Sequence, residues 1–285
     1  MAKITLSPHV ENYFVTMDWH DSQKNASEFS KELVNNYETG KVILIRNAPF
    51  SIDYELVNRI TLPRGRTHKK LSDSFFLYPR IYDPKVVGVL MECFEKDPGL
   101  YLKFRRQVNK LHAEIDRFFQ IAFEPYKFIK GNISWRLTES SDEFMHVDYF
   151  HNDEDVQYIR MFINVDQQPR IWNVTHSIDE LAARYYRGEN VAELEGTNAN
   201  EFCEKIGLLA FGGAENAGKD GHHRHIVEFD QGDVWLCDSR VVPHQVIFGR
   251  RAVSAKFRAD PNSMLDPSQR VVSRVKRYHE IYGHC

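Results

Sequence analysis

Several features that define common protein classes are missing from this sequence of 285 residues. No apolar run reaches the roughly 18 residues that a membrane-spanning helix needs, and the N-terminus lacks the apolar core of a secretory signal peptide. Cysteine is scarce, and no two cysteines have the Cys-x-x-Cys spacing of a zinc ribbon or a redox pair. We therefore expect a cytoplasmic protein with buried, reduced thiols. Its cysteines are Cys93, Cys203, Cys237 and Cys285.

An excess of basic charge is also absent. The formal net charge is −3, so no global positive field would recruit nucleic acid, and we expect no nucleic-acid partner. The glycine-rich segment 212–223 lacks the GxxxxGK[ST] spacing of a phosphate-binding loop and is expected to be a plain loop. The chain does have 42% apolar and 13% aromatic residues, which is enough for a large core.

The N-terminal region, residues 1–125, predicts helices around one or two strands. Apolar residues recur at helical spacing within 100–124, which indicates a long amphipathic helix. A β-rich apolar run at 41–46 ends before Pro49 and predicts a strand. Further helices are expected at 27–38, 54–61 and 84–94, with a basic loop at 62–72.

From about residue 128 the pattern changes to short β-rich runs that are separated by turns. Many short strands of this kind are typical of a sandwich or a jelly-roll barrel. We predict one mostly β, α+β domain over 1–285, with a double-stranded β-helix (a cupin-like jelly roll) at 126–262. The mainly helical region 1–125 packs on this core, helices are inserted at 178–188 and 200–211, and a C-terminal helix lies within 263–285. Strands are expected at 128–137, 144–150, 156–166, 170–174, 223–230, 232–238, 244–249 and 250–259.

The pattern His-x-Asp/Glu occurs four times, at His9, His112, His146 and His151, and with 13 histidines and 40 acidic residues such matches also arise by chance. His112 would place its partner Glu114 on another face of a helix. His151 lies in the charged stretch HNDED, which predicts a solvated loop. His146 differs because His146-Val147-Asp148 lies in the apolar run FMHVDYF, where alternation along a strand turns both polar side chains to one face.

A third ligand would come from His244, in VVPHQVIFG at the start of a late strand. Two imidazoles and one carboxylate on one side of an ion form the facial triad of non-haem Fe(II) oxygenases, which leaves positions open for other ligands. The alternative is that His146 and His244 are core histidines with satisfied hydrogen bonds. The spacing alone leaves both interpretations open.

Longer motifs around these residues resemble the Fe(II)- and 2-oxoglutarate-dependent dioxygenases, and more narrowly the Kdo (3-deoxy-D-manno-oct-2-ulosonic acid) hydroxylase family. The likeness is strongest over 134–180 and includes GDVWLCDSRVVPHQVIFG, while the loop 212–223 and the pair Arg250-Arg251 depart from the family pattern. It rests on an HVD-plus-aromatic segment, an Arg-x-Phe-x-Asn strand and a Pro-Arg-x-Trp turn. In this chain these are His146 to Phe150, Arg160-Met161-Phe162-Ile163-Asn164 and Pro169-Arg170-Ile171-Trp172.

The resemblance implies that His146, Asp148 and His244 bind Fe(II), and that 2-oxoglutarate and O₂ take the open positions. It favours Arg160 as the residue that holds the distal carboxylate of 2-oxoglutarate through a guanidinium fork. The usual dioxygenase rule, with an arginine on the strand after the distal histidine, offers Arg258 instead, or Arg251. Asn164 is expected to bind the cosubstrate or a metal ligand, or else to be a strand-end turn residue.

The resemblance also implies hydroxylation at C3 of a Kdo sugar in an anionic lipid-linked saccharide, Kdo-lipid A. Arg136 and Tyr149 are the residues expected to contact that sugar. Such a substrate lies at the inner membrane, so peripheral contact with its cytoplasmic face is expected. Basic residues that could contact anionic headgroups, or simply form solvated faces, are Arg64, Arg66, His68, Lys69 and Lys70 in the loop and Arg270, Arg274, Lys276 and Arg277 in the last helix.

Three other functions fit portions of the same pattern. A dioxygenase of the same chemistry could act on a protein side chain or a small metabolite, with only the pocket changed. A cupin-like isomerase or hydrolase would use the metal as a Lewis acid without 2-oxoglutarate. A jelly-roll carbohydrate-binding module would have no catalysis at all. Fe(II)-dependent formation of succinate that is lost in His146→Ala separates the dioxygenases from the other two.

Overall fold

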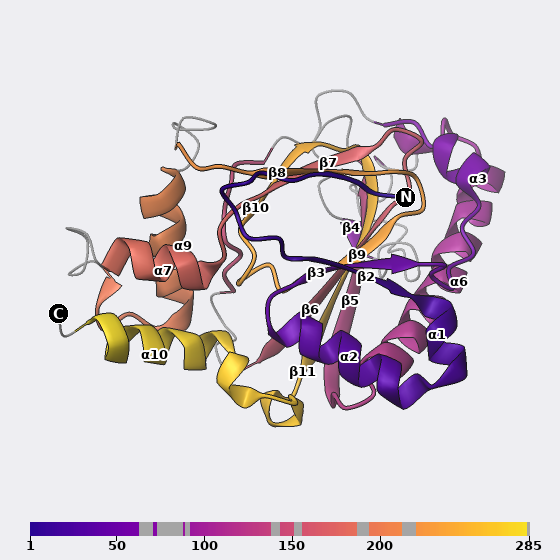
Figure 1. The fold of residues 1–285 in the computed structure, drawn as a ribbon. Helices are drawn as coiled ribbons and strands as arrows, with labels where there is room; N and C mark the ends of the chain where they lie inside the picture. The colour runs from indigo at the N-terminus through magenta and orange to yellow at the C-terminus, as the bar shows by residue number, and fades with distance from the viewer. Residues whose placement is uncertain are drawn as a thin grey trace.

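A computed structural model describes residues 1–62, 71–72, 88, 92–137, 143–150, 156–186, 194–212 and 221–283. Two sheets form the centre of the molecule (Figure 1), and all of their strand pairs are antiparallel except β2 with β3. In spatial order, the seven-stranded sheet contains β2 (Phe14–Asp18), β3 (Val42–Arg46), β9 (Val234–Leu236), β6 (Gln157–Asn164), β11 (Arg251–Ala259), β5 (Phe128–Leu137) and β4 (Leu71–Ser72). The four-stranded sheet contains β1 (Lys3–Thr5), β8 (His225–Phe229), β7 (Arg170–Val174) and β10 (His244–Phe248).

The helices form two groups at opposite ends of the sheets (Figure 1). In the first group, the Asp97 side chain caps the long helix α6 by accepting hydrogen bonds from the N–H groups of Gly99 and Leu100. The second group lies beside the four-stranded sheet, and its three helices contact one another. The first group is α1 (Trp19–Lys24), α2 (Ala26–Glu38), α3 (Tyr54–Asn58) and α6 (Pro98–Ala122), and the second is α7 (Ile178–Tyr186), α9 (Ala199–Phe211) and α10 (Val271–Tyr282).

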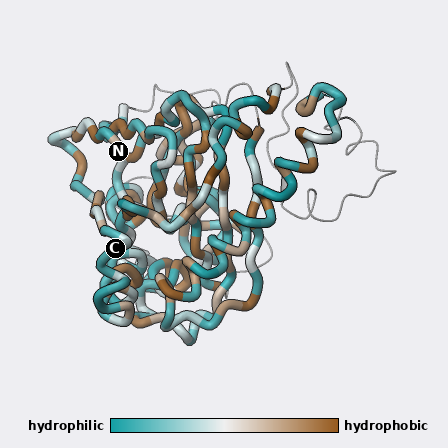
Figure 2. Tube along the Cα trace, turned by 90° about the vertical axis from the view of Figure 1, so that its right-hand side faces the viewer, coloured by the Kyte–Doolittle hydropathy of each residue, from teal (hydrophilic) through white to brown (hydrophobic). Residues whose placement is uncertain are grey.

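The largest region of the core lies between the seven-stranded sheet and helices α2 and α6. Successive side chains of a strand point to opposite faces, so every second residue of β5, β6 and β11 enters this core. The hydrophobic and hydrophilic colours accordingly alternate along the central strands (Figure 2). Phe119 of α6 stacks on Phe257 of β11 with ring centroids 4.0 Å apart. This packing leaves the opposite face of the same strands for other contacts.

The mixed α and β fold predicted from the sequence is confirmed, and its two mostly antiparallel sheets are consistent with a jelly roll. The division of the chain at 125 and 262 stays a prediction. Helix 84–94 and loop 62–72 lie largely outside the described residues, although Leu71–Ser72 forms a strand where a loop was expected. The sequence patterns did not predict β1, β2 and α1. Among the described helices, none is both long and apolar enough to cross a membrane.

Candidate functional site

The segment FMHVDYF is extended but is not the strand that its pattern predicted. A single isolated bridge, between His146 and His244, is its only ladder-type pairing among the described residues. The alternation of an extended chain is kept, because Met145 and Val147 are buried in the core beside α7 and α9. His146 and Asp148 therefore turn to the other side, as expected for alternate residues.

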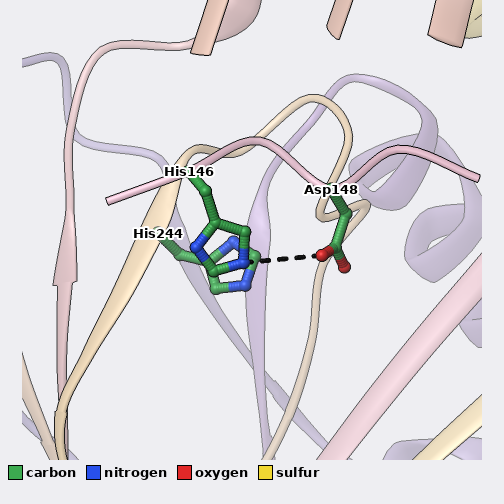
Figure 3. Close-up of side chains that lie close together, drawn as sticks. All are labelled: His146, Asp148 and His244. Carbon is green, nitrogen blue, oxygen red and sulfur yellow. Dashed lines mark ion pairs between the residues drawn. The ribbon is translucent and has the colours of Figure 1, made fainter. Parts of the chain in front are cut away.

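His244 is the first residue of β10, and its backbone is paired with that of His146. The N–H of His146 donates to the carbonyl of His244 at 3.1 Å, and the reverse hydrogen bond is 3.0 Å long. The side chains of His146, His244 and Asp148 point toward one another (Figure 3), and their ligand atoms all lie within 4.8 Å. Residues that lie 98 positions apart in the sequence thus form one compact cluster, as predicted.

The hydrogen bonds of the two histidines fix which nitrogen could bind a metal. Nδ1 of His146 lies 2.6 Å from the carbonyl oxygen of Phe144, and Nδ1 of His244 lies 3.1 Å from that of Val242. A carbonyl oxygen can only accept, so each Nδ1 carries the proton and donates it. The unprotonated Nε2 of each ring is then the metal-ligating atom, held in orientation by the backbone.

The carboxylate of Asp148 is held by two further side chains. The guanidinium of Arg160 donates to its Oδ2, and the hydroxyl of Ser239 donates to the same oxygen at 2.6 Å. The N–H of Asp148 also donates to the carbonyl of Ser239 at 2.9 Å. Burial opposes the charge of this carboxylate, but Arg160 and His146 outweigh it and hold the pKa of Asp148 well below its usual range. Asp148 is therefore an anion that can bind a cation.

The two histidines differ in their surroundings. Burial, together with the charge of His146, lowers the pKa of His244 to about 4, so His244 is neutral near pH 7. Its ring stacks on that of Trp172 at 4.8 Å between centroids. His146 is also partly desolvated, which lowers its pKa, but the adjacent Asp148 raises that pKa above the ordinary value. The cluster thus has one buried neutral imidazole and one that is paired with the carboxylate.

A cavity of about 160 Å³ opens between the two sheets at this cluster. Given the volume that a water molecule takes in the liquid, it has room for about five waters or one small organic acid. Arg136 of β5 lines it and donates to Glu143 at 2.8 Å, as expected for a residue near the cluster. Its lining consists of Arg136, Glu143, His146, Asp148, Arg160, Phe162, Arg170, Trp172, His244 and Val246.

The other residues predicted for the site lie at varying distances from it. Arg258 lines a neighbouring cavity of about 310 Å³ together with Lys130 and Lys256, and only Arg160 is shared by both cavities. The side-chain amide of Asn164 donates to the carbonyls of Gln168 and Phe229, and its oxygen accepts from the N–H of Asp166.

Asn164 is completely buried in these bonds. They commit its amide to the β6–β7 turn and to the end of β8, so of the two predicted roles the structure supports that of a strand-end residue. Tyr149 is 39% exposed and lies outside the lining of the cavity at the cluster. The structure therefore brings Arg136 and Arg160 to the cluster but not Tyr149.

The sequence patterns missed two residues near the cluster. Ser239 lies in the stretch GDVWLCDSRVVPHQVIFG, but no role was assigned to it, so only the fold shows that it contacts Asp148. Arg170 was noted in the Pro-Arg-Ile-Trp motif, but no role was assigned to it. Its 2% exposure and its place in the cavity lining make it a component of the site. A signal was present in the sequence, since an arginine between apolar strand residues needs an anionic partner.

The basic segments that were expected at a membrane surface are only partly described. The loop residues Arg64 to Lys70 lie outside the described residues. In α10, Arg274 is 3% exposed and donates to Asp179 and to the carbonyl of Glu38. This residue is a structural link between α10, α7 and α2, so it belongs neither to a surface for lipid headgroups nor to a solvated face, the two interpretations that the pattern of the helix left open.

A scan against models of protein families finds no match, and no curated protein sequence matches either. Solved structures do match over nearly the whole chain. They are structures of the Kdo hydroxylase KdoO, a non-haem Fe(II) α-ketoglutarate-dependent dioxygenase. Each match covers 94% of this chain and 96% of KdoO.

The KdoO complex with succinate and Fe(III) has a TM-score of 0.61 at 14% identity. The complex with cobalt(II) has 0.63 at 13%, and that with α-ketoglutarate and Fe(III) has 0.61 at 13%. These neighbours bind iron and α-ketoglutarate, in agreement with the class of enzyme and the cofactors that the sequence led us to expect. The similarity that the motifs indicated is confirmed at the level of structure: this chain has the fold of the Kdo hydroxylase KdoO.

Proposed function

We propose that this protein is a hydroxylase that depends on Fe(II) and 2-oxoglutarate. The observation that carries the proposal is the cluster of His146, Asp148 and His244 at a cavity between the sheets. Two imidazole donors and one carboxylate are a ligand set that suits Fe(II), and because they lie to one side they leave the other coordination positions open.

The residues around the cluster would perform separate tasks. The backbone carbonyls of Phe144 and Val242 hold the two Nε2 atoms in position, and Ser239 and Arg160 hold the carboxylate. Trp172 and Phe162 are buried beside the ligands and restrict the access of water. When bound, Fe(II) would supply the oxidation of 2-oxoglutarate by O₂ to succinate and CO₂, coupled to insertion of one oxygen atom into a C–H bond.

Measurement of succinate tests the class of reaction. The protein supplied with Fe(II), O₂ and 2-oxoglutarate should form succinate, and the His146→Ala variant should not. A protein that binds the metal but never consumes 2-oxoglutarate would instead be a non-redox metalloenzyme. Failure to bind a divalent metal at all would leave only a binding module with this fold.

For the substrate, we propose the Kdo sugar of an anionic lipid-linked saccharide, hydroxylated at C3. The similarity to a Kdo hydroxylase over 94% of the chain supports this choice. The three arginines of the cavity, Arg136, Arg160 and Arg170, suit a sugar that carries a carboxylate. Mass spectrometry of Kdo-lipid A incubated with the enzyme should show the gain of one oxygen atom on Kdo. If succinate forms without that gain, the protein is still a 2-oxoglutarate-dependent enzyme, but Kdo is not its substrate.

This substrate would place the enzyme in the cytoplasm, at the inner face of the membrane that holds the lipid. Contact would be peripheral. Sedimentation with vesicles that contain Kdo-lipid A, compared with neutral vesicles, tests the location: binding to neither vesicle would mean that the saccharide reaches the enzyme by another route.

A further inference from the structure

A second cavity opens next to the metal cluster, on the face of the seven-stranded sheet that points away from α2 and α6. Its volume is about 310 Å³, and Arg160, which donates to Asp148, lines both this cavity and the one at the cluster. Its floor is formed by β5, β11 and β6, which lie side by side in the sheet (Figure 1). We call this cavity the basic groove, because the charged side chains in its described lining are all basic: Lys130, Arg160, Lys256 and Arg258.

The strand register places these cations directly opposite one another. Lys256 of β11 pairs with Arg160 of β6, and Arg258 of β11 pairs with Lys130 of β5. Opposed side chains have Cβ atoms about 5 Å apart, and like charges at such positions destabilise a sheet. Successive residues on one face lie roughly 7 Å apart along a strand, so the four cations form one continuous patch. An arrangement that opposes stability in this way is expected where the cations bind an anion.

Two aromatic rings hold the ammonium group of Lys256 in the groove. Its Nζ lies 4.7 Å from the ring centroid of Phe150 and 5.1 Å from that of Tyr158. The face of an aromatic ring attracts a cation, and the centroids of the two rings are 4.2 Å apart. Phe150 comes two residues after Asp148, so one segment supplies metal ligands and also orients this lysine. The groove is therefore held in a fixed place relative to the cluster.

The cavity at the cluster cannot contain a saccharide of more than one sugar. At about 160 Å³ it has room for one small organic acid, so the remainder of a larger substrate must lie outside it. Three other cavities, of about 640, 470 and 470 Å³, share none of its lining among the described residues. The basic groove shares Arg160. A saccharide whose reacting sugar lies at the cluster would thus extend along the groove.

We propose that the basic groove binds a phosphate group of the saccharide substrate, with Lys130, Lys256 and Arg258 as the residues that contact it. A phosphate monoester has a charge of about −1.5 to −2 at pH 7 and three strong acceptor oxygens, so it can accept hydrogen bonds from several cations at once. Lysine binds phosphate as a compact point charge, and arginine binds it with a planar fork. This inference rests on the proposed function, and it names a group of the substrate that the enzyme recognises away from the reacting carbon.

Binding to the Co(II)-loaded protein tests the groove without turnover. The probes for calorimetric titration are Kdo-lipid A in detergent micelles and the same lipid after enzymatic removal of its phosphates. The wild type should bind the phosphorylated lipid at least about tenfold more tightly, and the double variant Lys256→Gln/Arg258→Gln should bind both lipids alike. If the wild type binds both lipids alike, or if the double variant weakens both equally, the groove binds no phosphate and the proposal is wrong.

Single variants at the exposed end of the groove avoid any loss of folding. Lys130 is exposed, so Lys130→Gln should fold normally and weaken only the phosphorylated lipid, and the reversed charge of Lys130→Glu should weaken it further. Lys127→Gln is the matched control, because Lys127 is an exposed cation three positions away that does not line the groove. It should bind both lipids as the wild type does. An equal loss in Lys127→Gln and Lys130→Gln would show that general surface charge attracts the lipid, which would overturn the proposal.

Turnover separates the groove from the proposed function. A contact that is the same in the ground state and the transition state affects KM and not kcat. Lys256→Gln/Arg258→Gln should therefore raise the KM for Kdo-lipid A at least about tenfold, with a much smaller effect on kcat. A fall in kcat at unchanged KM would contradict the proposal. A wild type that forms no succinate refutes the hydroxylase, but the difference in affinity between the two lipids still decides whether the groove binds phosphate.

Discussion

Strands β5, β6 and β11 present one face to helices α2 and α6 and the other to the four-stranded sheet. The helix-facing residues are apolar and fully packed, for example Trp135, Met161 and Val253. On the opposite face, most of the residues of these strands that line the two cavities are polar or charged, for example Arg136, Arg160 and Lys256. Adjacent residues of a strand point to opposite faces. The same strands therefore supply core residues on one face and residues of the site on the other. Changes on the two faces should therefore have separable effects.

His146→Ala should show the largest difference between its effect on metal binding and its effect on stability. Loss of a metal ligand should reduce Co(II) affinity and succinate formation more than about 100-fold, because even changes to residues that only support a ligand cost 10–100-fold. The unfolding free energy of the apo protein should change by less than about 1 kcal/mol, since the side chain is 36% exposed. Metal titration and denaturant unfolding measure the two effects.

His112→Ala is the matched control for that variant. His112 belongs to the rival His-x-Glu pattern, and it pairs with Asp116 on the surface of α6, far from the cluster in sequence. It should leave both metal affinity and turnover unchanged. A loss of Co(II) binding in His112→Ala together with normal binding in His146→Ala would show that the wrong motif was chosen.

On the helix-facing side, Phe119→Ala should show the converse. Its ring is fully buried and stacks on Phe257 and Phe123, so its removal should lower the unfolding free energy by about 3–5 kcal/mol. Co(II) affinity, measured under conditions where the variant is folded, should equal that of the wild type. A change in affinity of tenfold or more would mean that the two faces are coupled.

Asp166→Asn tests a buried charge that contributes to the stability of the fold and not to the site. Asp166 is 1% exposed and accepts from Arg250 and Arg251, so the loss of its charge should lower the unfolding free energy by about 3 kcal/mol at pH 7. Burial raises the pKa of this carboxyl, but the two arginines outweigh it and keep the pKa below its ordinary value.

The direction of the pH dependence follows from that depressed pKa. The stabilisation by Asp166 is present above the pKa of the unfolded chain, near pH 4, and is lost as pH falls through the lower pKa of the folded state. Denaturant unfolding between pH 2 and 5 should thus show a steeper acid loss for the wild type than for Asp166→Asn. Parallel curves would mean that another group carries the acid sensitivity.

The smallest effect is expected from Ser239→Ala, which removes one hydrogen bond to Asp148. Co(II) affinity should fall about tenfold, because the carboxylate loses a partner that orients it. Ser254→Ala is the control: Ser254 is also buried on the inner face, but it lines the neighbouring cavity. An equal loss of affinity in both variants would show that the effect comes from packing and not from orientation of Asp148.

The sequence predicted most strands, because alternation of polar and apolar residues is visible within one segment. The same alternation placed His146 and Asp148 on one side, and the motif around His244 supplied the third ligand. His146 and Asp148 lie on one side of FMHVDYF even though the segment is not a strand. Contacts between distant segments carried no such signal. The bond from Ser239 to Asp148 spans 91 positions. The pairing of Arg160 with Asp148 and the burial of Arg170 in the cavity wall likewise depend on which strands become neighbours.

Elements without a strong pattern were also missed. β1 is only three residues long, and it is held as a strand by pairing with β8, more than two hundred positions later. β2 has no clear alternation of burial and pairs in parallel with β3. Both strands owe their conformation to tertiary pairing and not to local propensity.

The mutual backbone bonds of His146 and His244 have a consequence for how such a site can change. The spacing of these two positions is set by main-chain atoms, which any amino acid other than proline supplies. Replacement of either imidazole by a thiolate or a carboxylate would alter which metals bind, while the attachment points of the donors stay in place. The positions of the donors therefore depend on the main chain, whereas their chemical identity depends on the side chains. A substitution at either position can change the metal preference while the fold stays the same.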